Sequence, residues 1–165
     1  PEIFVCQYLS NTNIMRLHAT CDCLVSPSFG EAWGIPIFDA MAMGKTPICT
    51  STGGPKDYLA EGGWLVKSNK EPCFGMIDSF AEMYMGNEEW DQIDLNELRK
   101  AMRDAHTNPI TREAKAKDGI NRSYEYSYQA VGLHMKNILE NNVTPFASAD
   151  KEFIHTKHSI KELIL

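Results

Sequence analysis

Two acidic side chains flank the start of a predicted helix. Glu31 lies in a glycine-containing loop after a short apolar run, and Asp39 lies one turn into the helix predicted from Pro36. The first N–H groups of a helix are unpaired and carry partial positive charge, so they suit a diphosphate. Carboxylates repel phosphates but accept hydrogen bonds from hydroxyl groups. A diphosphate between two hydroxyl-bearing rings, as in a sugar nucleotide, fits this arrangement.

The same acids also have a purely structural interpretation. A carboxylate near a helix start is favourable whether or not the helix binds anything. Glycine-containing loops before helices are common and weakly specific. On the residues alone, both interpretations stay open.

The segments around these acids alternate between strand-like and helical patterns. Apolar, β-branched runs predict strands at 3–8, 23–26, 47–50 and 64–66, and helical spacing predicts helices at 13–20, 36–43 and 56–60. Such alternation indicates βαβ units, and continuously apolar strands indicate a parallel sheet covered on both faces. Ligands of such sheets bind outside the carboxyl ends of the strands, which is where the Glu31 segment lies.

The second half of the chain is predicted to be helical. Helices are expected at 74–85, 96–106, 110–118 and 124–141. The expected fold is therefore α/β, a Rossmann-like parallel sheet flanked by helices over 1–142. A linker and a C-terminal helix or tail are expected over 143–165.

Composition limits the class of protein. The chain is 43% hydrophobic and 23% charged, and its net charge of −6 argues against a nucleic-acid partner. The five cysteines are odd in number and lack a C-x-x-C pair, so we expect reduced core thiols and no metal site. Reduced thiols fit a cytoplasmic location. No apolar run approaches the roughly 18 residues of a membrane span.

The segment around the two acids resembles the E-x7-E motif of family 4 and related retaining glycosyltransferases. Residues 28–47 read S-F-G-E-A-W-G-I-P-I-F-D-A-M-A-M-G-K-T-P, where that family has S-x-x-E-G-F-G-L-P-x-x-E-A-M-A-x-G-x-P. The resemblance continues into G-G-P-K-D-Y at 53–58 and G-G-W-L-V at 62–66. It implies a GT-B fold of two Rossmann-like lobes, of which this chain supplies part of the C-terminal, donor-binding lobe.

The resemblance assigns a role to each matching residue. It places Glu31, as the catalytic residue, against donor-sugar hydroxyls near the reacting carbon, and Asp39 against the ribose hydroxyls. The donor sugar and diphosphate would face the backbone of the surrounding loop, namely Gly30, Ala32, Trp33, Gly34 and Ile35. Tyr8 and Leu9 match the position that contacts the nucleobase, although Tyr8 also suits a core aromatic.

Two positions depart from the family pattern. Asp39 replaces the usual Glu, which shortens its reach by one methylene but keeps the same hydrogen-bond acceptors. Ala32 replaces the usual Gly, so its backbone must avoid positive φ. Neither change is expected to disable the site.

The implied activity is metal-independent and cofactor-independent hexosyl transfer, with retention, from a nucleotide-diphosphate sugar to a glycan or lipid acceptor. The Arg and Lys that clamp the diphosphate in this family, and the N-terminal acceptor-binding lobe, have no counterpart here. We therefore expect the C-terminal part of a longer enzyme, which alone binds donors weakly and transfers nothing. Any membrane contact is expected to be peripheral and through the N-terminal lobe.

Two other functions stay open from the residues. The chain could be a stand-alone nucleotide-sugar-binding or partner-docking module, with another chain covering an exposed sheet edge. A Rossmann-type epimerase is disfavoured, because the sequence lacks a G-x-G-x-x-G fingerprint and a suitably placed Tyr-x-x-x-Lys pair.

Overall fold

The computed structural model describes residues 2–73 and 87–142. The helix predicted at 74–85 and the tail predicted over 143–165 lie outside these described residues. The chain divides into two compact units, the first ending at Ser127 and the second beginning at Tyr128. The second unit contains one described helix, α6 (Tyr128–Asn142).

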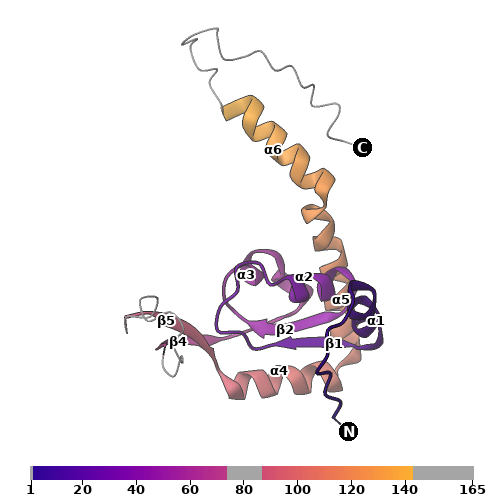
Figure 1. Cartoon of the computed structure of the whole chain (residues 1–165), viewed down its shortest axis with the longest axis vertical. Coiled ribbons are helices and arrows are strands. Elements are labelled where there is room, and N and C mark those ends of the chain that lie inside the picture. The colour runs from indigo at the N-terminus through magenta and orange to yellow at the C-terminus, as the bar shows by residue number, and fades with distance from the viewer. Residues whose placement is uncertain (1, 74–86, 143–165) are drawn as a thin grey trace. The chain divides into compact units, whose positions relative to one another are not determined.

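A three-stranded parallel sheet forms the centre of the first unit. It consists of β1 (Cys23–Ser26), β2 (Thr46–Thr50) and β3 (Trp64–Val66), in the order β1-β2-β3 (Figure 1). Every residue of β2 is buried, as expected for the central strand of a sheet covered on both faces. The predicted strands 23–26, 47–50 and 64–66 are thus confirmed.

Helices cover both faces of this sheet. The helical elements are α1 (Asn11–Thr20), α2 (Ile35–Ala42), α3 (Pro55–Tyr58), the 3-10 turn η1 (Ala60–Gly62), α4 (Leu95–Thr107), α5 (Pro109–Ser123) and the 3-10 turn η2 (Tyr124–Tyr126). Ile48 of β2 packs with Leu98 of α4 in one core cluster, whereas the next residue, Cys49, packs with Met41 of α2 and Tyr58 of α3 in the other. Successive strand side chains point to opposite faces, so one buried strand serves two cores. Figure 1 shows α4 on one side of the sheet and α2 and α3 on the other. The α/β fold with a parallel sheet flanked by helices is confirmed.

The strand predicted at 3–8 is wrong. Residues 2–6 have no regular secondary structure, and Ile3 and Phe4 are 88% and 82% exposed. A strand is stable only when its N–H and C=O groups are paired with a neighbour, and none of the described strands pairs with this segment.

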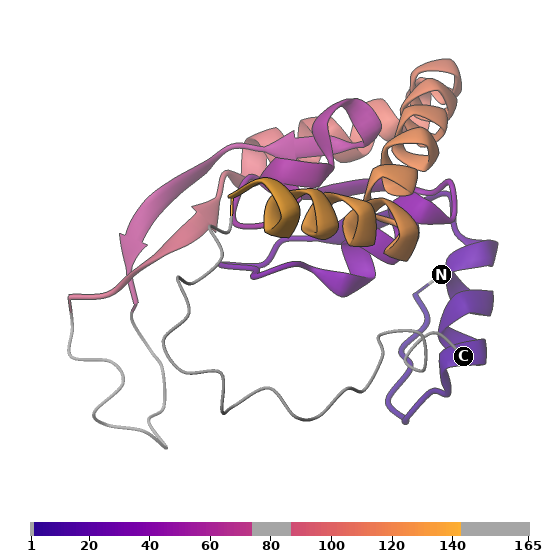
Figure 2. The ribbon, with the colours of Figure 1, turned by 90° about the horizontal axis from the view of Figure 1, so that it is seen from above.

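Two strands were not predicted. β4 (Ser68–Pro72) and β5 (Glu89–Ile93) form an antiparallel ribbon, seen most clearly in Figure 2, where it extends from the parallel sheet. β4 reads S-N-K-E-P, a polar run that has neither alternation nor β-branched residues. The sequence of β4 therefore does not predict a strand, and its extended conformation depends on pairing with β5.

The long helix predicted over 124–141 is interrupted. Tyr124–Tyr126 forms a 3-10 turn, Ser127 is extended (φ −63°, ψ 152°), and α6 begins at Tyr128. An extended residue cannot continue the helical hydrogen-bond pattern, so the helical ladder ends there.

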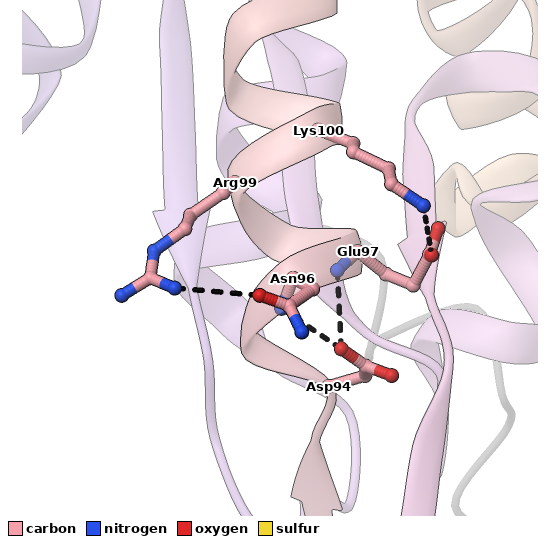
Figure 3. A network of polar contacts seen from close by, with 5 residues as sticks. All are labelled: Asp94, Asn96, Glu97, Arg99 and Lys100. Carbon is pink, nitrogen blue, oxygen red and sulfur yellow. Dashed lines mark hydrogen bonds and ion pairs between the residues drawn. The ribbon is translucent and has the colours of Figure 1, made fainter.

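A network of polar contacts fixes the start of α4 (Figure 3). The Asp94 carboxylate accepts hydrogen bonds from the N–H groups of Asn96 (2.8 Å) and Glu97 (3.2 Å), as an N-cap does. These backbone bonds hold the pKa of Asp94 below its ordinary value. Glu97 in turn pairs with Lys100 (2.6 Å), and Arg99 donates to the Asn96 side chain (3.4 Å).

The prediction of core thiols is confirmed for Cys49 and Cys23 and wrong for Cys6 and Cys21. Cys49 is buried, Cys23 is half-buried against the core, Cys6 and Cys21 are exposed, and all five cysteines are free. Within residues 2–73 and 87–142, no helix is long and apolar enough to cross a membrane. The same residues contain no group of three or more His, Cys, Asp or Glu side chains that could hold a metal ion.

Candidate functional site

The loop of residues 27–34, which we call the Glu31 loop, joins the end of β1 to the start of α2. Gly34 caps α2 with φ 76° and ψ 59°, the left-handed conformation that favours glycine. A Cβ at this position would lie 3.0 Å from Ile37 Cδ1 and 3.2 Å from the Tyr58 hydroxyl oxygen. Ala32 avoids positive φ, as the sequence requires, since Ala60 alone among the described non-glycine residues has φ above zero.

The start of α2 presents unpaired donors. Gly34 uses its carbonyl to accept from the N–H groups of Ile37 (2.9 Å) and Phe38 (3.0 Å). The N–H groups of Trp33, Gly34 and Ile35 donate no hydrogen bond to any described residue. They are the orphan donors expected at a helix start, and the helix dipole adds partial positive charge there.

Glu31 is held by a short hydroxyl chain. Ser28 Oγ donates to Glu31 Oε1 (2.7 Å), and the Ser26 and Ser28 hydroxyl oxygens lie 3.1 Å apart. The second carboxylate oxygen, Oε2, has no hydrogen-bond partner among the described residues. Glu31 therefore has one oxygen that fixes its orientation and another that can accept from a ligand.

A second glycine turn packs directly against the Glu31 loop. Gly53, which follows β2, has φ 53°, and a Cβ there would lie 1.7 Å from the carbonyl oxygen of Glu31. The N–H of Gly54 donates to the Ala32 carbonyl (3.1 Å). Both turns follow carboxyl ends of parallel strands, so they meet at the edge where α/β proteins bind ligands.

Asp39 lines a cavity beside α2. This half-buried residue is the fifth of α2, and the cavity of about 380 Å³ runs between α2 and α1. Its lining residues are Asn11, Ile14, Met15, His18, Ile35, Pro36 and Asp39. Asp39 makes no ion pair or side-chain hydrogen bond with another described residue, so both of its oxygens can accept.

Both acids influence one buried tyrosine beneath the helix start. The Tyr58 hydroxyl donates to the Gly34 carbonyl (3.2 Å) and is fully buried. Burial raises the pKa of Tyr58, and the charges of Cys49, Glu31 and Asp39 raise it further. Burial, with a smaller contribution from Glu31, likewise raises the pKa of the Cys49 thiol to about 12. Glu31 and Asp39 thus both lie close enough to Tyr58 for their charges to act on its hydroxyl.

Tyr8 and Leu9 lie before α1 and do not line the Asp39 cavity. Tyr8 is 93% exposed, so it is not a core aromatic, and Leu9 is half-buried. Ser10 next to them caps α1, where its hydroxyl accepts from the Asn13 N–H (3.4 Å). A nucleobase contact by Tyr8 and Leu9 stays a prediction.

An aromatic cluster that sequence reasoning missed anchors the loop. The ring of Trp33 lies 4.9 Å from Tyr58, 5.3 Å from Tyr126 and 5.4 Å from Phe38, measured between centroids. Such pairs contribute about 0.5–1.5 kcal/mol each beyond their buried area. The signal in the sequence is four aromatic residues at distant positions, and only the fold shows that they meet.

The site thus combines an α/β fold, unpaired N–H groups at a helix start and a carboxylate on either side of them. In a comparison with known families, residues 1–82 match the family described as glycosyl transferases group 1. The matched range includes the Glu31 loop, α2 and both glycine turns, and it supports a glycosyltransferase function. No curated protein matches the chain.

Proposed function

We propose that the Glu31 loop and the start of α2 bind a nucleotide-diphosphate sugar, and that the chain serves as the C-terminal, donor-binding part of an enzyme that transfers this sugar, with retention, to a glycan or lipid acceptor. The observation that carries the proposal is the set of unpaired N–H groups at Trp33, Gly34 and Ile35, flanked by Glu31 and Asp39. The match to group 1 glycosyltransferases supports it independently.

Each part of the ligand has a chemical counterpart in the site. The unpaired N–H groups suit the diphosphate, and Glu31 Oε2 suits the hydroxyls of the donor sugar. Gly30 and Ala32 flank Glu31, so their backbone would lie against the same sugar. The Asp39 cavity, at about 380 Å³, is within the usual range for small-molecule sites and offers a carboxylate to the ribose.

The start of α2 can stabilise the negative charge that develops on the diphosphate during sugar transfer. Cleavage of the bond between sugar and diphosphate leaves negative charge on the diphosphate, which the N–H groups and dipole of α2 stabilise. Glu31 orients the sugar through its hydroxyls. Lys45 follows the C-terminal end of α2, away from the helix start, and its amino group donates to the Ala19 carbonyl (3.1 Å). Further positive charge on the diphosphate would come from groups outside the described residues, such as those of an N-terminal lobe.

The role of Asp39 is testable with a ligand pair that differs in one hydroxyl. A ribonucleoside diphosphate should bind more tightly than its 2′-deoxy analogue, and Asp39→Ala should abolish that difference. A hydrogen bond to a charged group contributes about 1.5–3 kcal/mol, roughly 10- to 100-fold in Kd. Asp118→Ala, at an exposed site on α5, is the matched control. An unchanged preference in Asp39→Ala would exclude Asp39 from the ribose site.

A second candidate function, a partner-docking module, rests on the free edge of β1. β1 pairs only with β2 among the described strands, and a cavity of about 370 Å³ lies beside it, lined in part by Cys23, Val25 and Met102. An open strand edge is a template for another chain or lobe. Light scattering tests whether two copies of the chain associate through this edge. A protein that stays monomeric over a wide concentration range would argue against such self-association.

A further inference from the structure

The β4–β5 ribbon contacts the Glu31 loop at two points. The Asp91 N–H of β5 donates to the Phe29 carbonyl (2.9 Å), and the rings of Phe29 and Trp90 stack at 4.2 Å with an interplanar angle of 14°. Phe29 is two residues before Glu31 and adjacent to Ser28, whose hydroxyl orients the Glu31 carboxylate. The ribbon is therefore joined to the segment that sets the position of Glu31.

The Asp91 side chain ties the ribbon to the second glycine turn. Its Oδ2 accepts from Thr52 Oγ1 (2.6 Å) and Lys70 Nζ (2.9 Å), and its Oδ1 accepts from Ser68 Oγ (3.2 Å). Thr52 directly precedes Gly53, which abuts the Glu31 carbonyl. The Asp91 backbone thus holds one turn of the site while its carboxylate holds the other.

These contacts give the ribbon a role in positioning the Glu31 loop, which its sequence does not indicate. A binding site needs its groups held within a fraction of an ångström, and loops achieve this only when neighbouring contacts lock them. The Glu31 loop has no regular secondary structure of its own. Its position depends on what packs against it: the aromatic cluster at Trp33, and, around Glu31, the glycine turn and the ribbon.

We propose that Asp91, together with Thr52 and the Phe29–Trp90 stack, forms a clamp that positions Glu31 for the sugar of the donor. This inference rests on the proposed function, because it takes Glu31 as the sugar-binding acid. These residues are positioning residues: they act on the ligand through Glu31 and the loop.

Two variants three residues apart test the clamp. Asp91→Ala removes the carboxylate that holds Thr52, Lys70 and Ser68, whereas Asp94→Ala removes the α4 cap and touches neither turn. Both substitutions delete a carboxylate that accepts several hydrogen bonds in or next to β5. Any general effect of weakening this region should therefore appear in both variants.

The first measurement is independent of any ligand. Amide hydrogen exchange of Gly54, whose N–H donates to Ala32 of the Glu31 loop, reports whether the two turns stay together. We expect exchange at Gly54 to speed up at least tenfold in Asp91→Ala, relative to Asp94→Ala. Equal exchange rates in the two variants would overturn the clamp. Trp90→Leu, which keeps the β5 backbone pairing but removes the stacked ring, should also accelerate exchange at Gly54 and provides a second route if Asp91→Ala fails to fold.

The second measurement separates the clamp from the proposed function. Affinities are measured for a panel of nucleoside diphosphates and their sugar conjugates. In Asp91→Ala we expect a roughly tenfold loss for the sugar conjugate that binds, little change for its diphosphate, and no further loss when Glu31→Gln is added. Equal losses for both ligands, or additive losses in the double variant, would contradict positioning through Glu31. If Glu31→Gln alone changes nothing, the sugar-binding role of Glu31 fails, while Gly54 exchange still decides whether the ribbon holds the loop.

Discussion

Two threonines near the end of β2 differ in whether their hydroxyls are paired, and a pair of Thr→Val substitutions measures that difference. Thr50 Oγ1 is buried and has no hydrogen-bond partner among the described residues. Thr52, 7% exposed, donates to the Asp91 carboxylate at 2.6 Å. Valine has nearly the shape of threonine, so each substitution mainly removes a hydroxyl.

The two substitutions should have opposite signs. A hydrogen bond to a charged group contributes about 1.5–3 kcal/mol, and Asp91 keeps Lys70 and Ser68, so Thr52→Val should cost about 1.5 kcal/mol. An unpaired buried hydroxyl costs about 1–3 kcal/mol, so Thr50→Val should raise the free energy of unfolding by about 1 kcal/mol. The variants should therefore differ by about 2.5 kcal/mol.

Urea denaturation followed by tryptophan fluorescence gives both values, provided that the slope with urea is unchanged. The same denaturation measurements at several pH values test the contact with Asp91. Hydrogen bonds from Thr52 and Lys70 hold the pKa of Asp91 below its ordinary value. A lowered folded-state pKa stabilises the fold above the unfolded pKa of about 4, and that stability is lost as the pH falls through the folded value. The cost of Thr52→Val should accordingly shrink towards pH 2. If Thr50→Val destabilises as much as Thr52→Val at pH 7, the assignment of these hydroxyls is wrong.

Three further perturbations have defined outcomes. Gly34→Ala forces a Cβ into the left-handed region, so it should lower stability by about 1–2 kcal/mol in urea denaturation and weaken diphosphate binding. Asp94→Ala should lower the melting temperature by a few degrees at pH 7. The deficit should diminish below about pH 4, because the lowered pKa of Asp94 means that the ionised carboxylate stabilises the fold more than the protonated acid does. At pH 8 a thiol reagent should modify the exposed Cys21 in the native protein, whereas Cys49, buried and with its pKa raised to about 12, should react only on unfolding. Modification of native Cys49 at the rate of Cys21 would contradict its burial.

The parallel sheet could be predicted because its strands carry their own signal. The apolar runs at 23–26, 47–50 and 64–66 read as strands without any knowledge of their partners, and the central run is buried along its whole length. The run at 3–8 has a similar composition but lacks a paired strand among the described residues. Composition reports the tendency to be a strand, whereas pairing decides the outcome.

The placement of the two acids around the start of α2 could be predicted, but not what holds Glu31 in place. The spacing of Glu31 and Asp39 around Pro36 indicates a helix start between two carboxylates, and the structure has that arrangement. The contact between Thr52 and Asp91 joins residues 39 positions apart through a polar ribbon. No local pattern encodes such a contact, because it depends on where the fold places β5.

The central claim is that Glu31 binds the sugar of a nucleotide-sugar donor. Its most direct test is an NMR titration of the isotope-labelled chain, which detects weak binding, with a panel of nucleoside diphosphates and their sugar conjugates. The matched control for Glu31→Gln is Glu113→Gln, an exposed acid on α5. We predict that one conjugate shifts the amides of Trp33, Gly34 and Ile35, binds more tightly than its diphosphate, and loses that advantage in Glu31→Gln alone. An advantage that survives in Glu31→Gln, or shifts confined to other parts of the chain, would contradict the claim.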